Sequence, residues 1–120
     1  MKKAGLLLVM TMVVAIQSIA QTAPNKYWIQ FTDKHNTPYS INQPGQFLSD
    51  RSLERRVRYG IPVTEQDLPV NPFYIDSLRR IGVTVLNRSK WFNAVTIYTT
   101  DTSKLSLIRR LSFVRQLKSV

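Results

Sequence analysis

Cysteine is absent from this chain of 120 residues, and histidine occurs once, at His35. Without cysteine the fold has no disulfide scaffold, so packing alone has to hold it together. One histidine among scattered carboxylates does not supply the convergent ligands that a zinc site needs. We therefore expect no metal site and no cofactor, and we expect His35 to be a solvated loop residue.

Glycine is also scarce, and the short motifs of common active sites are missing. The four glycines, at positions 5, 45, 60 and 82, are too far apart to form a loop that cradles phosphate. No serine lies in a Gly-x-Ser-x-Gly elbow, and there is no cysteine to act as a nucleophile. The sequence therefore predicts no self-sufficient active site, so we expect that this chain is not an enzyme.

The amino terminus has the pattern of a secretory signal peptide. Lys2-Lys3 precedes an apolar run over residues 4–16, and residues 18–20 (SIA) form a small-x-small cleavage pattern. A transmembrane anchor is the alternative, but a span needs roughly 20 apolar residues and this run is shorter. We expect residues 1–20 to be removed on export. Residues 21–120 would then form one secreted domain, periplasmic or extracellular, with no stable membrane anchor.

Basic residues outnumber acidic residues in the sequence, which has a formal net charge of +10. Three arginine doublets stand out, at residues 55–56, 79–80 and 109–110. At helical spacing the second and third doublets lie opposite apolar residues, which is typical of the solvated outer face of a helix packed on a core. The functional alternative is attraction to an acidic partner surface or to an outer-membrane glycolipid.

One amphipathic helix is marked at both ends. Asn71 can cap it, and Pro72 fits its first position because the missing N–H costs nothing there. Apolar residues then share one face, and Gly82 supplies a left-handed stop. After Gly82 the period changes from helical to alternating, which indicates strands.

The other elements follow from the same periodicities and turn signals. We expect a first strand over residues 27–32, an extra helix over 47–59 and a connecting loop over 61–70. Two strands around 83–85 and 91–99, joined by a turn at 87–90, should follow the helix that begins at Pro72. A last helix, capped by Asp101, Thr102 or Ser103, and a final strand over 113–120 should complete the fold. This order is β-α-α-β-β-α-β. Without the extra helix it is βαββαβ, so we expect an α+β fold of the ferredoxin-like type.

The strands of this fold carry aromatic residues on both faces. Two helices cover only one face of such a sheet, and the other face should be mainly polar in a monomer. Trp28, Phe92 and Tyr98 alternate with the residues that would face the helices. An uncovered aromatic face usually marks a partner site. Alternatively, the extra helix folds over this face and buries its own apolar stripe there.

An RNA-recognition module shares the βαββαβ order and is a remote alternative. Its third strand requires Lys/Arg-Gly-aromatic-small-aromatic. Residues 90–94 (KWFNA) lack the glycine and the second aromatic residue, and the signal peptide would export the domain away from RNA. We therefore expect no nucleic-acid partner.

Three longer segments of the sequence are distinctive: FLSDRSLERR at 47–56, DLPVNP with YIDSLRRIGV at 67–72 and 74–83, and VLNRSKWFNAV at 85–95. They resemble the N-terminal propeptide region of secreted bacterial subtilisin-like serine protease (subtilase) precursors. The likeness covers roughly residues 27–120. It implies a ferredoxin-like propeptide whose open sheet face packs on the protease, assists its folding and lays its C-terminal tail in the active-site cleft.

On this resemblance Trp28, Phe92 and Tyr98 would face the protease, and Ser119 and Val120 would lead toward its cleft. The subtilase motifs Asp-Thr-Gly, His-Gly-Thr and Gly-Thr-Ser are missing, so no catalytic residue can be assigned. We expect a folding aid and inhibitor of a subtilisin-like catalytic domain, acting in cis or in trans, here as a truncated precursor or fragment. The alternatives are a stand-alone secreted protease inhibitor and a surface-interaction domain unrelated to proteolysis.

Overall fold

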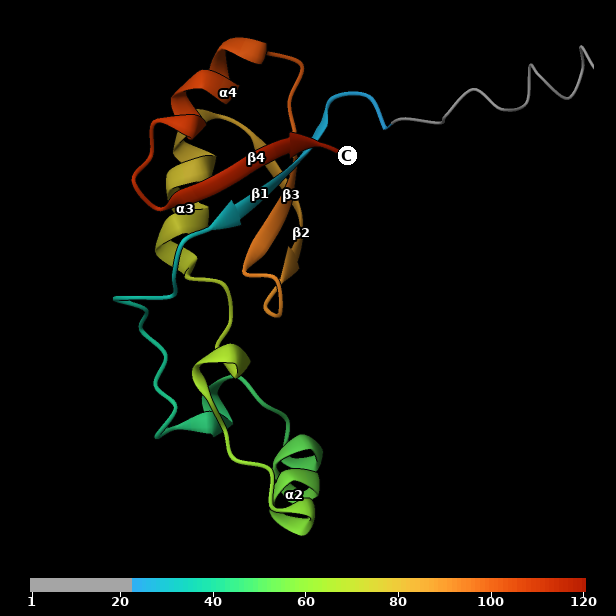
Figure 1. Ribbon diagram of the computed structural model, residues 1–120, viewed down its shortest axis with the longest axis vertical. Coiled ribbons are helices and arrows are strands. Elements are labelled where there is room, and N and C mark those ends of the chain that lie inside the picture. Colours follow the sequence, from blue (N-terminus) through green and yellow to red (C-terminus); the bar gives the residue numbers. More distant parts are fainter. Residues whose placement is uncertain (1–22) are drawn as a thin grey trace, which may run out of the picture.

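The computed structural model describes residues 23–120, so the predicted signal peptide at 1–20 lies outside the described residues. Strands, α-helices and two short 3₁₀ helices (η) follow one another in the order shown in Figure 1. They are β1 (Lys26–Phe31), η1 (Pro44–Gln46), α2 (Asp50–Tyr59), η2 (Glu65–Asp67), α3 (Pro72–Ile81), β2 (Thr84–Ser89), β3 (Ala94–Tyr98), α4 (Thr102–Arg109) and β4 (Val114–Ser119).

The four strands form one antiparallel sheet in the order β2-β3-β1-β4. Helices α3 and α4 lie together on one side of this sheet (Figure 1). The α+β class is therefore confirmed, and the arrangement is compatible with the expected ferredoxin-like fold. We call the sheet face that α3 and α4 leave uncovered the open face. Among residues 23–120, the structure contains no helix that is both long enough and apolar enough to span a membrane.

The core lies between the sheet and the two helices. Alternate residues of β1 and β3 meet apolar residues of α3 and α4 there, and all of them are buried. The buried residues contributed by these four elements are Ile29, Phe31, Val95, Ile97, Ile75, Leu78, Leu105 and Ile108. At one edge of the core the rings of Tyr74 and Phe113 stack with their centroids 4.2 Å apart.

The predicted signals at the two ends of α3 are confirmed. The Asn71 side chain accepts a hydrogen bond from the Phe73 N–H at 3.0 Å, and Pro72 is the first residue of the helix. Gly82 follows with φ = 101°, in the left-handed region that glycine enters without strain. A Cβ at Gly82 would lie 2.8 Å from the Lys104 Nζ atom, but the end of this flexible side chain can move aside, so the positive φ is what favours glycine.

The turn between β2 and β3 lies later in the chain than its polar residues predicted. We expected it at residues 87–90, but β2 continues to Ser89 and the turn occupies residues 90–93. Because β2 is the edge strand, its polar side chains can face solvent while its backbone stays paired with β3. Asn93 closes the turn with φ = 50°, a conformation that asparagine tolerates.

The extra helix also differs from the prediction. It begins at Asp50 instead of residue 47, because the Ser49 side chain caps it by accepting a hydrogen bond from the Ser52 N–H. None of the residues in α2 is buried, and Val57, which we expected on its apolar stripe, is 84% exposed. Helix α2 does not fold over the open face. It belongs to an arm, residues 34–70, that extends beyond the end of the sheet (Figure 1).

Candidate functional site

The open face carries a shallow hollow of about 450 Å³ between β1, β3 and the end of β4. Strand pairing builds it, because Trp28 lies opposite Thr96 on one side and opposite Lys118 on the other. Side chains directly opposite on antiparallel strands point to the same face. The lining residues are Trp28, Phe92, Thr96, Lys118, Ser119 and Val120. Four of the five residues predicted to contact a partner therefore border a single hollow.

Trp28 forms the floor of this hollow and is half-buried. The Lys118 Nζ atom lies 4.7 Å from the centroid of its ring, within the range of a cation–π interaction. This contact partly covers an indole that would otherwise face water. Lys118 was missed in the sequence, because only the register between β1 and β4 brings it over Trp28.

Phe92 belongs to the β2–β3 turn, and the strand position that we predicted for it is wrong. The turn still presents its ring at the hollow, with the side chain 65% exposed. The Gln30 side-chain amide fixes this geometry by donating a hydrogen bond to the Phe92 carbonyl at 3.2 Å. Trp91 beside it is also largely exposed. Tyr98 is 40% exposed on β3 and pairs with Lys26, outside the lining of the hollow.

The last two residues, Ser119 and Val120, lie at the end of β4, beside β1. Ser119 is paired with Tyr27, and the Val120 N–H donates to the Lys26 carbonyl at 3.1 Å. Val120 is half-exposed at the end of the hollow. The described chain thus passes from the sheet to its carboxyl end directly beside the exposed aromatic surface.

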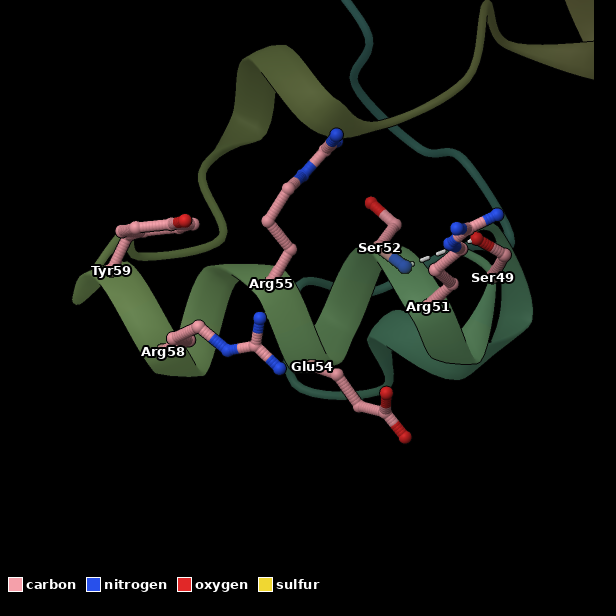
Figure 2. A pocket seen from close by; sticks show the side chains of 7 residues that line it. All are labelled: Ser49, Arg51, Ser52, Glu54, Arg55, Arg58 and Tyr59. Atoms are coloured by element: carbon pink, nitrogen blue, oxygen red, sulfur yellow. Dashed lines mark hydrogen bonds between the residues drawn. The ribbon is translucent and has the colours of Figure 1, made fainter.

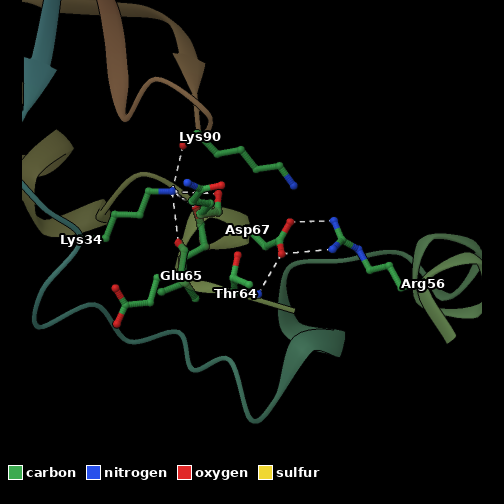
Figure 3. A network of polar contacts seen from close by, with 8 residues as sticks. Lys34, Arg56, Thr64, Glu65, Asp67 and Lys90 are labelled. Carbon is green, nitrogen blue, oxygen red and sulfur yellow. Dashed lines mark hydrogen bonds and ion pairs between the residues drawn. The ribbon is translucent and has the colours of Figure 1, made fainter. Parts of the chain in front are cut away.

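A lysine clamp joins the arm to the β2–β3 turn (Figure 3). The Lys34 ammonium donates to the carbonyl oxygens of Leu68 at 2.7 Å and Lys90 at 2.8 Å, and also to those of Gln66 and Glu65. Burial lowers the pKa of Lys34, the nearby Lys90 lowers it further, and Asp67 opposes this shift. The clamp therefore holds the backbone of the turn from which Phe92 projects.

A buried ion pair holds α2 to the rest of the arm (Figure 3). The Arg56 guanidinium donates to both carboxylate oxygens of Asp67, at 2.6 and 3.1 Å, and the Asp67 side chain is only 4% exposed. Burial acts against ionisation of Asp67, but the Thr64 N–H and the Arg56 guanidinium together hold its pKa below 3.8. Arg56 could not be told apart from Arg55 in the sequence, because only the folded position of Asp67 shows which of the two arginines it pairs with.

A third polar contact holds Asp33, the residue just before the arm, against α3. The Tyr74 hydroxyl donates to the Asp33 carboxylate. Burial and then this carboxylate raise the pKa of Tyr74 to about 12. The same hydrogen bond, followed by the His35 N–H, lowers the pKa of Asp33. His35 itself is exposed, as expected. Within residues 23–120 no three His, Asp or Glu side chains come together as metal ligands would.

The comparison with protein families shows which family the chain belongs to. Residues 26–120 match the family model of the Peptidase S8 propeptide domain of Bacteroidota. The chain belongs to this family. The match includes every strand and helix described above, and it confirms the resemblance to subtilase propeptides. Comparisons with curated proteins and with solved structures gave no match.

Membership of the subtilase propeptide family implies a partner for this domain. A propeptide domain is not a catalytic domain, and it implies association with the subtilisin-like catalytic domain of its precursor. Subtilase propeptides belong to secreted precursors. The hollow and the exposed turn present apolar groups next to Ser119 and Val120.

Proposed function

We propose that this propeptide acts as a folding aid and inhibitor of a subtilisin-like catalytic domain, which it contacts through its open face. The observation that carries the proposal is the group of exposed aromatic side chains on a sheet face that no helix covers. Phe92 and Tyr98 lie on this face, and Trp28 lies between them in a hollow. Large apolar groups in such a position gain free energy when a partner removes them from water.

The course of the C-terminal residues supports inhibition. Ser119 ends β4, Val120 follows it, and both line the hollow, so a protein seated on the open face would contact this segment. An extended segment fits a protease cleft because substrates bind there as strands. The proposal includes export through the predicted signal peptide and action in cis or in trans, with no nucleic-acid partner.

The test is inhibition of a Bacteroidota subtilase catalytic domain by purified residues 21–120. Phe92→Ala and Tyr98→Ala should each weaken inhibition by roughly thirtyfold, about 2 kcal/mol, if these rings are desolvated at the centre of the interface. Their thermal melts should stay close to that of the parent, because neither ring belongs to the buried core. Removal of Ser119 and Val120 should also weaken inhibition.

Phe73→Ala is the matched control. Phe73 is a phenylalanine of similar exposure, 56%, but it lies at the start of α3 on the other side of the sheet. This variant should inhibit as well as the parent. Equal losses in Phe73→Ala and Phe92→Ala would show that the open face has no special role. A parent domain that neither inhibits the protease nor assists its refolding would favour a surface-interaction domain unrelated to proteolysis.

A further inference from the structure

Helix α2 is held in place although none of its residues is fully buried. It has ten residues, and helices of this length are marginal in water on their own. Its ends are fixed by the Ser49 cap and by Gly60 at φ = 62°, and the buried pair between Arg56 and Asp67 anchors its middle. The fold therefore uses a desolvated ion pair to orient a helix that adds no residue to the core. Anchoring an exposed helix in this way is consistent with a binding role for its outer surface.

That outer surface is cationic. Arg51, Arg55 and Arg58 follow the spacing i, i+4, i+7, which puts them on one side of the helix. We call these three residues the arginine stripe. All three are exposed and line a shallow hollow of about 450 Å³ (Figure 2). The other lining residues are Ser49, Ser52, Tyr59 and one exposed acidic residue, Glu54. Among the described residues no carboxylate lies within 4 Å of the stripe in an ion pair.

The position of α2 would allow one partner protein to contact both the stripe and the open face. Helix α2 lies beyond the end of the sheet where the β2–β3 turn is found, and the C-terminus lies toward the opposite end (Figure 1). The arm leaves the body next to the start of α3, where the Asn71 side chain donates a hydrogen bond to the His35 carbonyl at 2.7 Å, and it extends away from the sheet as far as α2 (Figure 1). The lysine clamp ties the arm to the turn that carries Phe92. A protein that covers the open face and this turn would therefore meet α2 next.

We propose that the arginine stripe is a second docking site, which binds a carboxylate-rich surface of the same subtilisin-like catalytic domain. This inference rests on the proposed function and adds a partner chemistry to it. Guanidinium groups pair with carboxylates through two parallel hydrogen bonds, which gives both attraction and orientation. The open face would supply apolar contact, and the stripe would select an acidic partner and speed its approach.

The experiment reverses the charge of the stripe. The triple variant Arg51→Glu, Arg55→Glu, Arg58→Glu is compared with the parent for its association rate with the catalytic domain at low and at high salt. We expect association at low salt to slow by about tenfold or more, and the salt dependence of the parent to disappear. Dissociation should change less, because the apolar contact at the open face stays intact.

A second triple variant provides the matched control. Arg80→Glu, Arg109→Glu and Arg110→Glu make the same change in net charge at exposed positions on or next to α3 and α4, away from the arm. Its association rate should fall by less than threefold. Equal slowing in the two triples would overturn the inference, since net charge alone would then explain the effect. An unchanged rate in the stripe variant would overturn it as well.

Two further measurements separate the remaining explanations. If circular dichroism shows that α2 has melted in the glutamate triple, the same test is made with Arg51→Gln, Arg55→Gln, Arg58→Gln, because glutamine favours helix. Backbone amides of α2 should exchange more slowly with solvent in the complex than in the free parent. Absence of this protection contradicts a contact at α2.

Different results would refute the proposed function and the second docking site. A parent that does not inhibit the catalytic domain refutes the proposed function and this inference with it. A parent that inhibits, beside a stripe variant that inhibits equally fast, refutes only the second site. Binding to lipopolysaccharide vesicles that depends on the stripe, with no change in protease association, would assign the stripe to a glycolipid and overturn the inference.

Discussion

The sheet with α3 and α4, which we call the body, and the arm at residues 34–70 are stabilised by different kinds of contact. In the body, buried apolar side chains from both layers fill one continuous core. In the arm, Leu48 and Leu68 are buried without joining that core, only Val70 at the end of the arm joins it, and α2 contributes no buried residue. The Lys34 clamp and the pair of Asp67 with Arg56 hold the arm instead (Figure 3).

This difference predicts how each region loses its structure when a contact is removed. Apolar burial is spread over many contacts, so a defect in the core lowers the stability of the whole body. The arm depends on a few directional polar contacts, and losing one should open the arm while the sheet stays folded. The proposed functions follow the same division, with a rigid docking face on the body and a separately anchored cationic helix on the arm.

The largest effect should come from the body. Ile97 is fully buried in the core, so Ile97→Ala removes packed atoms and leaves a cavity. We expect a loss of about 2–5 kcal/mol in the free energy of unfolding, measured by denaturant titration. Val57→Ala on the exposed side of α2 should change it by less than about 0.5 kcal/mol. Similar losses in the two variants would contradict the contrast between body and arm.

The arm should respond most strongly to loss of its buried carboxylate. Asp67→Asn leaves the Arg56 guanidinium without its charged partner, which should cost about 3 kcal/mol in the local stability of the arm. Hydrogen exchange should accelerate at η2 and α2 but not at β3. Asp76→Asn is the control, because Asp76 pairs with Arg79 at 3.6 Å with both side chains about half exposed, and such pairs contribute little. Uniform acceleration throughout the sheet would show that arm and body unfold together.

The connection between the two regions can be tested at Lys34. Lys34→Met keeps the aliphatic stem but removes the ammonium that donates to carbonyls of the arm and to Lys90. We expect a loss of about 2 kcal/mol and faster exchange in the β2–β3 turn as well as in the arm. Lys104→Met, which removes a single exposed hydrogen bond to the Gly82 carbonyl, should cost much less. Faster exchange in the arm alone would mean that the clamp does not fix the turn.

The smallest effect concerns pH. The pKa of Tyr74 is raised from 10.0 to about 12 in the folded protein. Its contribution is therefore complete below pH 10 and is lost as the pH rises from 10 toward 12. The pKa of Asp33 is lowered, so its contribution is present above its ordinary value of 3.8 and is lost as the pH falls below that value.

Tyr74→Phe isolates this contact. It should cost about 1 kcal/mol at pH 7, measured by denaturant titration, and should flatten the loss of stability between pH 10 and 12. Tyr59→Phe, at an exposed ring in α2, should keep the pH profile of the parent. An identical alkaline profile in Tyr74→Phe and the parent would exclude Tyr74 as its source.

The sequence allowed accurate prediction where the signals are local. Asn71, Pro72 and Gly82 delimit α3 through backbone geometry within a few residues, so they function in the same way in almost any fold. The same is true of Asp101, whose side chain caps α4 by accepting from the Ser103 N–H. The element order, the α+β class and the solvated arginines of α3 could be predicted for this reason.

Prediction failed where a contact joins residues that are distant in the sequence. The turn moved to residues 90–93 because pairing with β3 keeps the polar edge strand extended. The alternative that the extra helix covers the open face is not realised, because Asp67 anchors α2 elsewhere, and the sequence alone could not decide this. Periodicity identifies which side of a helix is apolar, but it does not specify what that side meets.

The sequence by itself determined the elements, their order and the aromatic composition of the strands, since these depend on propensities and spacing along one segment of chain. Only the tertiary structure decided that Lys118 covers Trp28, that Lys34 clamps the turn of Phe92, and that the arginine stripe faces outward. These features depend on register and on buried charge. Both are fixed by pairwise contacts between distant segments, which no local pattern encodes.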